Sequence, residues 1–149
     1  MSLYVLILFS VLNHSAYVGS RVAVSLFAIH LDASPLVVGT LMSLYGVLPM
    51  LFSVSVGRLS DRIGPRAPML SGSILVVSGA LLAFAFPGVT TLYFAAALIG
   101  TGFMTFQVTV QNIVGFIGKP ERRPANFSKV AVGFSISAFL GPMLTGLAI

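Results

Sequence analysis

Five long apolar stretches, separated by short polar segments, are the feature that most constrains how this chain folds. A helix rises 1.5 Å per residue, so about 20 apolar residues cross the roughly 30 Å hydrocarbon core of a bilayer. Each stretch is about that long or longer, and the segments between them concentrate proline, glycine and charge. The predicted spans are residues 3–29, 35–56, 68–86, 91–117 and 124–149. The sequence therefore predicts an all-α membrane protein with five transmembrane helices.

The composition excludes the usual soluble classes. Of the 149 residues, 57% are hydrophobic and 7% are charged, whereas about a quarter of the residues of a soluble domain are charged. There is no cysteine, and hence no disulfide or thiolate metal site. The two histidines and three acidic residues form no metal-ligand cluster or nucleophile–histidine–carboxylate set, and no phosphate-binding glycine loop is present. We therefore expect no enzyme activity, no cofactor and no metal.

Proline and glycine mark the predicted helix ends. Pro35, Pro68 and Pro124 each lie where a helix would begin, because a proline in the first turn forfeits no hydrogen bond. Ser34 is the predicted N-cap before the second span. The sequence Phe-Pro-Gly at residues 86–88 leaves only a tight turn, which predicts that the third and fourth spans form an antiparallel hairpin.

The basic residues predict the orientation, because cytoplasmic loops of membrane proteins collect Lys and Arg. The predicted cytoplasmic loops 57–67 and 118–123 carry three basic residues each, whereas the connections around Asp32 and Gly88 carry none. We therefore place the N-terminus and both basic loops in the cytoplasm. The expected location is a bacterial inner (plasma) membrane, crossed several times. On this interpretation the net charge of +5 is an orientation signal, and nucleic acid is not an expected partner.

The first span carries nearly all its polar residues on one side, within an arc of roughly 120° at about 100° per residue. These residues are Ser10, Asn13, His14, Tyr17, Arg21 and Ser25. An arginine inside a span costs about 2.5 to 3.5 kcal/mol on insertion scales, so Arg21 should face water or a partner. We interpret Asn13, His14, Tyr17 and Arg21 as lining a solute pathway, with Arg21 attracting an anionic group. Alternatively, Arg21 extends to the membrane interface, while Asn13 and His14 make structural bonds between helices.

The fourth span adds Gln107 and Gln111, one helical turn apart, as further pathway candidates. Amide side chains in membranes also join helices without binding a solute, and that alternative stays open. No acidic residue lies at mid-membrane, so a proton relay within this chain would use His14. A purely structural histidine is the competing interpretation.

Small residues recur every four positions in the fifth span. The members of this packing motif are Gly133, Ser137, Gly141 and Thr145, with Pro142 and Gly146 beside them. Small residues at this spacing let two helix backbones approach closely, and a proline inside a helix removes a hydrogen bond and bends it. The motif therefore predicts close helix packing with a kink.

Residues 57–66, with the sequence GRLSDRIGPR, closely resemble the signature between the second and third helices of the major facilitator superfamily, G-x-L-[SA]-D-R-x-G-[RK]-[RK]. Three residues of this segment also have a physical interpretation that does not depend on the family. Gly57 permits close helix approach, and Asp61 can pair with Arg62 or with a helix N-terminus. Gly64 allows a tight turn before the third span.

The resemblance implies a gating role for this segment, since in that family it latches the two halves of the transporter together in the outward-open state. The residues that would carry this role are Gly57, Asp61, Arg62, Gly64 and Arg66. Pro65 stands where the signature expects a basic residue, so part of the contact network differs.

Residues 133–146 resemble the fifth-helix motif of the antiporter branches of the family, which ends G-P-x-x-G-G, although Thr145 replaces the first of the final glycines. This resemblance favours export by exchange. The fourth-helix motif of proton-linked exporters is matched only in part, because Ala96 and Ile99 occupy its arginine and glutamine positions. The usual arginine for proton coupling is therefore missing.

The resemblance implies five helices of a six-helix N-terminal half of a secondary active transporter, which moves a small solute by alternating access, with efflux as the expected direction. The expected partners are the lipid bilayer, a small-molecule solute, and a missing C-terminal half or a second polypeptide. We expect the chain to be truncated. The alternative is a membrane subunit that does not transport by itself. A small homodimeric multidrug exporter is disfavoured, because the first span lacks a membrane carboxylate.

Overall fold

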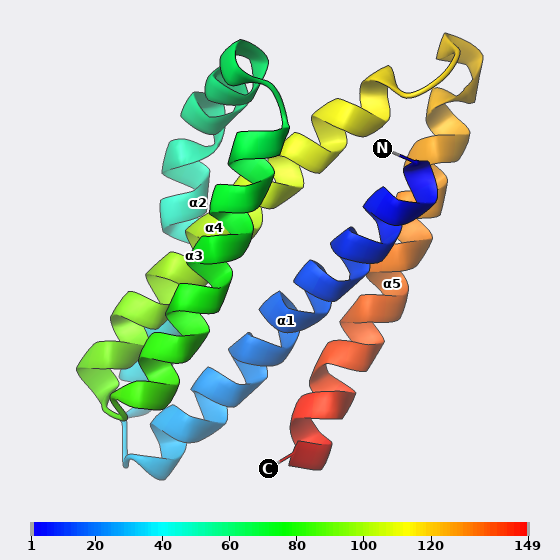
Figure 1. Ribbon diagram of the computed structural model, residues 1–149. Coiled ribbons are helices and arrows are strands. Elements are labelled where there is room, and N and C mark those ends of the chain that lie inside the picture. The colour runs from blue at the N-terminus through cyan, green and yellow to red at the C-terminus, as the bar shows by residue number, and fades with distance from the viewer. Residues whose placement is uncertain (1, 149) are drawn as a thin grey trace.

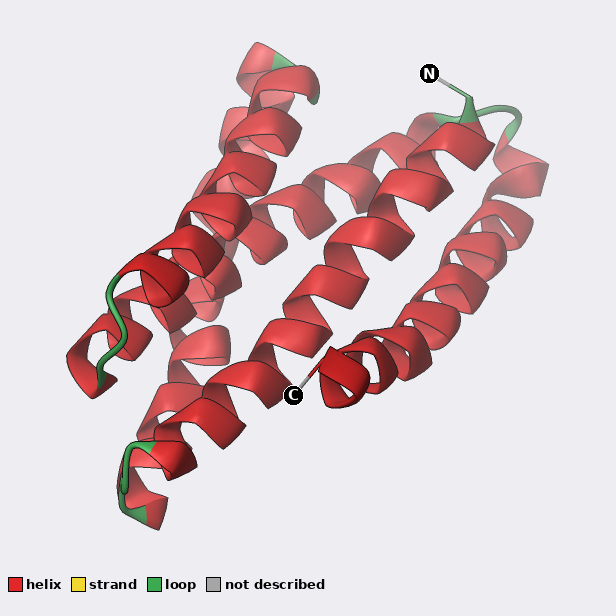
Figure 2. Ribbon diagram, turned by 60° about the horizontal axis from the view of Figure 1, so that its bottom comes forward, coloured by secondary structure: helices red, strands yellow, loops and turns green. Residues whose placement is uncertain are grey.

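The computed structural model describes residues 2–148, and these are almost entirely helical (Figures 1 and 2). In chain order the elements are α1 (Leu3–His30), α2 (Pro35–Ile63), α3 (Arg66–Ala85), α4 (Val89–Phe116), the short 3₁₀ helix η1 (Pro120–Arg122) and α5 (Arg123–Ala148). Within this part of the chain, five helices are long and apolar enough to cross a membrane. The predicted fold class is confirmed. Ile149, the predicted last residue of the fifth span, lies outside the described residues.

α4 is the central helix. Half of its most apolar window is buried within the protein, against 17–22% for the other four helices. It packs against α1, α2, α3 and α5, and in Figure 1 it crosses obliquely from the α3 turn to the connection with α5. α1 lies alongside α5. The solute-pathway candidates on α1 and α4 therefore belong to neighbouring helices.

α3 and α4 form the predicted antiparallel hairpin, and their backbones touch. A Cβ atom added to Gly102 would lie 2.6 Å from the carbonyl oxygen of Gly72, and one added to Gly72 would lie 2.6 Å from the carbonyl oxygen of Gly102. Real Cβ atoms essentially never approach so closely. Only glycine on both helices allows this contact, which holds the hairpin together over its middle turns.

Two apolar clusters form the interior. One joins α1, α2, α3 and α4 and consists of Val24, Ala28, Leu41, Tyr45, Val76, Leu92, Ala96 and Ile99. The other joins α1, α4 and α5 nearer the N-terminus and consists of Leu6, Phe106, Val110, Val114 and Val130. The aromatic and polar candidates of α1 lie between these clusters along the helix.

Helix ends agree with the sequence except at α2. The Oγ of Ser34 accepts a hydrogen bond from the backbone N–H of Val37, so the predicted N-cap is present. α2 does not stop at residue 56 but continues to Ile63, so most of the segment 57–67 is helix rather than loop. The helix ends at Gly64, whose φ of 79° is the left-handed conformation that glycine adopts without strain. Gly57 lies inside the helix and does not end it.

Candidate functional site

The polar face of α1 reaches three other helices. Asn13 Nδ2 donates a hydrogen bond to Ser73 Oγ on α3, at 3.4 Å. His14 Nδ1 lies 2.6 Å from Ser137 Oγ on α5. The hydroxyl of Tyr17 donates to a backbone carbonyl oxygen of α2, at 3.5 Å. Three neighbouring candidates on α1 therefore lie where α1 meets α3, α5 and α2.

Aromatic rings surround His14 and Tyr17. The rings of Tyr17 and Phe103 are stacked, with centroids 4.1 Å apart and planes 16° apart. The His14 ring lies 5.3 Å from the Phe103 ring and 4.9 Å from the Phe134 ring. Tyr45 meets Tyr17 edge to face at 5.7 Å. We call these five residues the aromatic cluster. The edge-to-face pairs, Tyr17 with Tyr45 and His14 with Phe134, have the geometry that ring quadrupoles favour.

Arg21 lies at one edge of the aromatic cluster. Its guanidinium carbon is 6.0 Å from the centroid of the Tyr17 ring, within the range of a cation–π interaction. The side chain is exposed rather than buried. A guanidinium has five N–H donors, so Arg21 can contact an aromatic face and still bind an anion.

The two glutamines of α4 differ in surroundings. Gln107 is half-buried, and its Oε1 has no hydrogen-bond partner among residues 2–148. Asn13 Oδ1 is also buried and has no hydrogen-bond partner among these residues. A buried acceptor without a partner costs free energy, so each of these oxygens can accept a hydrogen bond from a donor outside residues 2–148. Gln111 is exposed, one turn farther along α4.

Sequence reasoning missed several members of the site. Phe103 lies four residues before Gln107 and therefore shares its helix face, which was a usable signal. Ser137 was predicted only as a packing residue, yet it contacts His14. Nothing in the local sequence shows that Tyr45 or Phe134 meets α1, because that depends on how the helices cross.

The segment of residues 57–66 is held by a side chain that the sequence did not single out. Asn112 Nδ2 on α4 donates a hydrogen bond to Asp61 Oδ1 on α2, at 2.7 Å. Among residues 2–148, Asp61 makes neither of the predicted pairings, with Arg62 or with a helix N-terminus. Because α2 is still helical here, adjacent residues point in different directions and do not face each other.

A cavity of about 490 Å³ lies between the ends of α2 and α4. Asp61 and Asn112 line it, together with Ser60, which is buried and whose Oγ has no partner within residues 2–148. Gly57 makes no close approach within residues 2–148, because an added Cβ would lie 3.9 Å from its nearest neighbour there, in ordinary contact. Arg62 and Arg66 are exposed.

The packing motif of α5 meets α1 over part of its length. A Cβ added to Gly141 would lie 2.7 Å from the carbonyl oxygen of Ser15, and one added to Gly133 would lie 3.0 Å from a side-chain carbon of Val11. A Cβ added to Gly146 would have no atom of residues 2–148 within 4 Å, so Gly146 makes no such contact with the described residues. Pro142 lies inside the continuous helix α5.

Comparison with known proteins identifies the family. Residues 4–149 match the family model described as the Major Facilitator Superfamily. The chain belongs to the Major Facilitator Superfamily. This membership confirms the predicted resemblance and makes the chain part of a multi-pass membrane protein of a transporter family, embedded in a lipid bilayer.

Relatives within the Major Facilitator Superfamily are transporters. The chain is 33% identical over 117 residues to a di-/tripeptide transporter of Lactobacillus helveticus and 25% identical over 117 residues to the inner membrane transport protein YajR of Escherichia coli (strain K12). It is 31% identical over 113 residues to human solute carrier family 67 member A1. These alignments cover 76%, 76% and 72% of this chain but 24%, 25% and 26% of the relatives. The matched part thus spans about a quarter of each relative.

Proposed function

We propose that the protein containing this chain moves a small solute across the membrane by alternating access, as a secondary active transporter. The observation that carries the proposal is the polar face of α1, which places Asn13, His14 and Tyr17 among three neighbouring helices of a transporter-family fold. Gln107 and Gln111 on α4 extend the proposed pathway. Rocking of one half of such a transporter against the other exposes a central site to each side in turn.

Short peptides are the proposed solutes. Three of the relatives bear the name di-/tripeptide transporter, from Lactobacillus helveticus and two Lactococcus lactis subspecies. A peptide has a terminal carboxylate, and Arg21 is an exposed cation at the edge of the aromatic cluster. Arginine binds carboxylates through paired, charge-assisted hydrogen bonds. We therefore assign Arg21 to the carboxylate end of the peptide.

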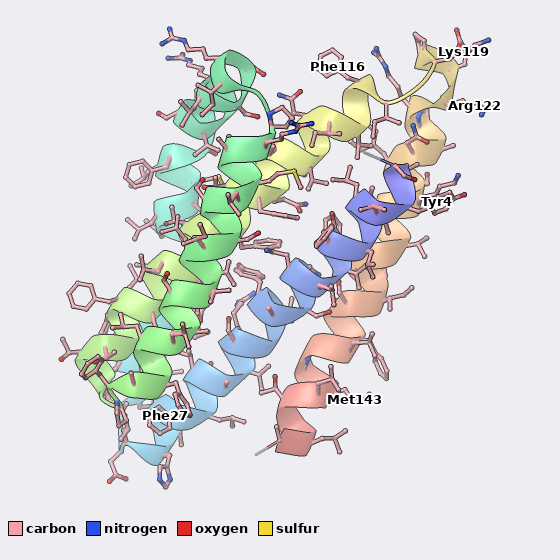
Figure 3. The ribbon with its side chains drawn as sticks, viewed as in Figure 1. Tyr4, Phe27, Phe116, Lys119, Arg122 and Met143 are labelled. Carbon is pink, nitrogen blue, oxygen red and sulfur yellow. The ribbon has the colours of Figure 1, made fainter. Side chains whose placement is uncertain are left out.

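We further propose that transport is efflux and that residues 57–66 form a gate at the cytoplasmic end. The small-residue pattern of α5, which resembles antiporter branches, supports efflux by exchange. The segment with Asp61, Arg62 and Arg66 supports a gate at the cytoplasmic end, where the Asp61–Asn112 hydrogen bond joins α2 to α4. Lys119 and Arg122 lie at the same end of the bundle as Tyr4, opposite Phe27 (Figure 3). That distribution supports a cytoplasmic N-terminus, and we propose a bacterial inner membrane as the location.

Counterflow in proteoliposomes tests this function. The complete natural protein, loaded with unlabelled dialanine, should accumulate external radiolabelled dialanine, whereas empty liposomes should not. Arg21→Gln should raise KM about tenfold or more, because it removes a charge-assisted contact worth about 1.5 to 3 kcal/mol. Arg58→Gln, at an exposed basic residue of α2, is the matched control and should leave KM unchanged. An unchanged KM in Arg21→Gln rejects its role with the carboxylate.

A membrane subunit that transports only together with a second polypeptide is the second candidate. Exchange of dialanine only when a second membrane polypeptide is purified with this one would support it. Absence of exchange in both preparations contradicts peptide transport.

A further inference from the structure

The link between His14 and Ser137 joins the first and fifth helices at the centre of the aromatic cluster. The two side chains lie 123 residues apart in the sequence, and His14 Nδ1 is 2.6 Å from Ser137 Oγ. Ser137 is fully buried and His14 half-buried. A neutral imidazole carries one proton, on either Nδ1 or Nε2, and the partner of one nitrogen decides what the other can do.

The serine has only one proton to give. Ser137 Oγ also lies 2.9 Å from the carbonyl oxygen of Phe134, one turn back, and is oriented to donate to it. Donation from a serine to its own helix backbone is common in helices and recurs nearby, where Ser135 donates to Ala131. If the Ser137 proton points to Phe134, Oγ can only accept from His14. The proton of His14 is then on Nδ1.

This arrangement leaves Nε2 of His14 with a free lone pair. Nε2 has no hydrogen-bond partner among residues 2–148, and it is not one of the fully buried unpaired atoms. An unprotonated Nε2 accepts hydrogen bonds and cannot donate them, so it suits an N–H or O–H group and not a carboxylate. The acidic residues Asp32, Asp61 and Glu121 lie at helix ends and in connections, away from this level of the bundle.

The rings beside His14 suit a positively charged donor. Aromatic faces carry negative quadrupole density, which attracts ammonium groups within about 6 Å, and the rings of Phe103 and Phe134 lie 5.3 Å and 4.9 Å from the His14 ring. A peptide amine offers both N–H donors and positive charge. Arg21 lies within about 12 Å of the His14 ring, because Tyr17 is 6.2 Å from that ring and 6.0 Å from the guanidinium carbon. An extended tripeptide spans about 10 Å, so its two ends can reach both residues.

We propose that Ser137 positions His14 as the Nδ1–H tautomer, so that Nε2 accepts a hydrogen bond from the amine of a transported peptide. The recognition of the amine rests on the peptide transport proposed above. The proposed tautomer does not rest on it, since it is argued from the two contacts of Ser137 alone. Ser137 is a positioning residue in this scheme, and His14 is the residue that touches the solute.

Nitrogen NMR tests the positioning. The complete protein, labelled with ¹⁵N-histidine in nanodiscs at a pH where the ring is neutral, should show His14 with a protonated Nδ1 and an unprotonated Nε2. The signal is assigned by its loss in His14→Gln. Ser137→Ala should shift the tautomer ratio toward Nε2–H, Ser137→Thr should restore it, and Ser135→Ala is the matched control. A predominantly Nε2–H ring in the unsubstituted protein, or an unchanged ratio in Ser137→Ala, overturns the proposal.

Competition between two peptides tests the recognition. Dialanine and N,N,N-trimethyl-dialanine both carry a positive terminus, but only dialanine has N–H donors there. The unsubstituted protein should prefer dialanine by about tenfold, the value of a charge-assisted hydrogen bond. In His14→Phe, which keeps a ring and removes the acceptor, the preference should fall to about threefold or less.

Each outcome of the competition has a distinct meaning. Transport of dialanine with the same preference in His14→Phe contradicts the role of His14 while peptide transport stands. No transport of either peptide by the unsubstituted protein contradicts the proposed solute, and the amine contact with it, while the tautomer measurement still decides the role of Ser137.

Discussion

The α3–α4 hairpin and the α1–α5 pair both bring helix backbones together at glycines, but they differ in what else they carry. Gly72 and Gly102 hold the hairpin by direct backbone contact, and within residues 2–148 no side-chain hydrogen bond joins α3 to α4. In the α1–α5 pair, Gly141 contacts α1 and a buried hydroxyl also meets His14. The first pair is held by close packing alone, whereas the second also contains a polar contact between its two helices.

Gly102→Ala should have the largest effect on stability. The added Cβ would meet the carbonyl oxygen of Gly72 at 2.6 Å and the backbone nitrogen of Val76 at 2.9 Å, and neither can move without the helix. We expect a loss of about 3 kcal/mol, at the upper end of the usual cost of overpacking. Thermal unfolding in detergent measures it. Gly46→Ala on α2, with nothing within 4 Å, is the control and should be neutral or slightly stabilising. Equal stability of the two variants would refute the close-packing account.

Gly141→Ala should cost less, about 2 kcal/mol. Its Cβ would lie 2.7 Å from the carbonyl oxygen of Ser15 and 3.1 Å from the backbone nitrogen of Gly19, so α1 and α5 must separate slightly. Gly146→Ala is the control within the same helix, because its Cβ would meet no atom of the described part of the chain within 4 Å. Thermal unfolding midpoints compare all four glycine variants. A greater loss in Gly141→Ala than in Gly102→Ala would reverse the comparison between the two helix pairs.

Ser137→Ala should cost about 1 kcal/mol, the net value of a hydrogen bond, because it leaves the imidazole of His14 without its partner. Ser135→Ala removes an exposed serine of the same helix and should change stability by less than about 0.5 kcal/mol. The difference between the two unfolding midpoints is the measurement. If the two variants are alike, the polar link does not distinguish the α1–α5 pair from the hairpin.

Asp61→Asn should change the unfolding midpoint least, because the Asp61 carboxylate is exposed, and should act on transport instead. Replacing a carboxylate oxygen by an amide group weakens its bond with Asn112 and removes the charge proposed for the gate. We expect a several-fold lower rate of dialanine counterflow with normal membrane insertion. Arg58→Gln, in the same helix, is the control. Normal turnover in Asp61→Asn would remove it from the gate.

Much of the fold could be predicted from the sequence, because the apolar length of each helix is visible in its own residues. The apolar length predicted every span, and the Phe-Pro-Gly turn predicted the α3–α4 hairpin. The predicted end of α2 at residue 56 was wrong, since a lone glycine such as Gly57 weakens a helix without ending it. The helix ends at Gly64, where the backbone takes a conformation that glycine favours.

Less of the site could be predicted. Helical periodicity placed Asn13, His14 and Tyr17 on one face of α1, and they do face neighbouring helices. Periodicity says nothing about what lies opposite that face. The partner that Asp61 has in the structure could not be predicted, because Asn112 comes from a different helix 51 residues later.

The sequence by itself determined that this protein folds in a lipid bilayer, how many spans it has and which polar residues share a helix face. These properties depend on hydropathy and helical periodicity, which act within a few turns of chain. Only the tertiary structure decided that His14 meets Ser137, that Asn112 holds Asp61, and that Gly72 lies on Gly102. Those pairings depend on how helices far apart in the chain cross. The apolar surfaces of membrane helices are alike, so the sequence of one helix does not show which other helix it packs against.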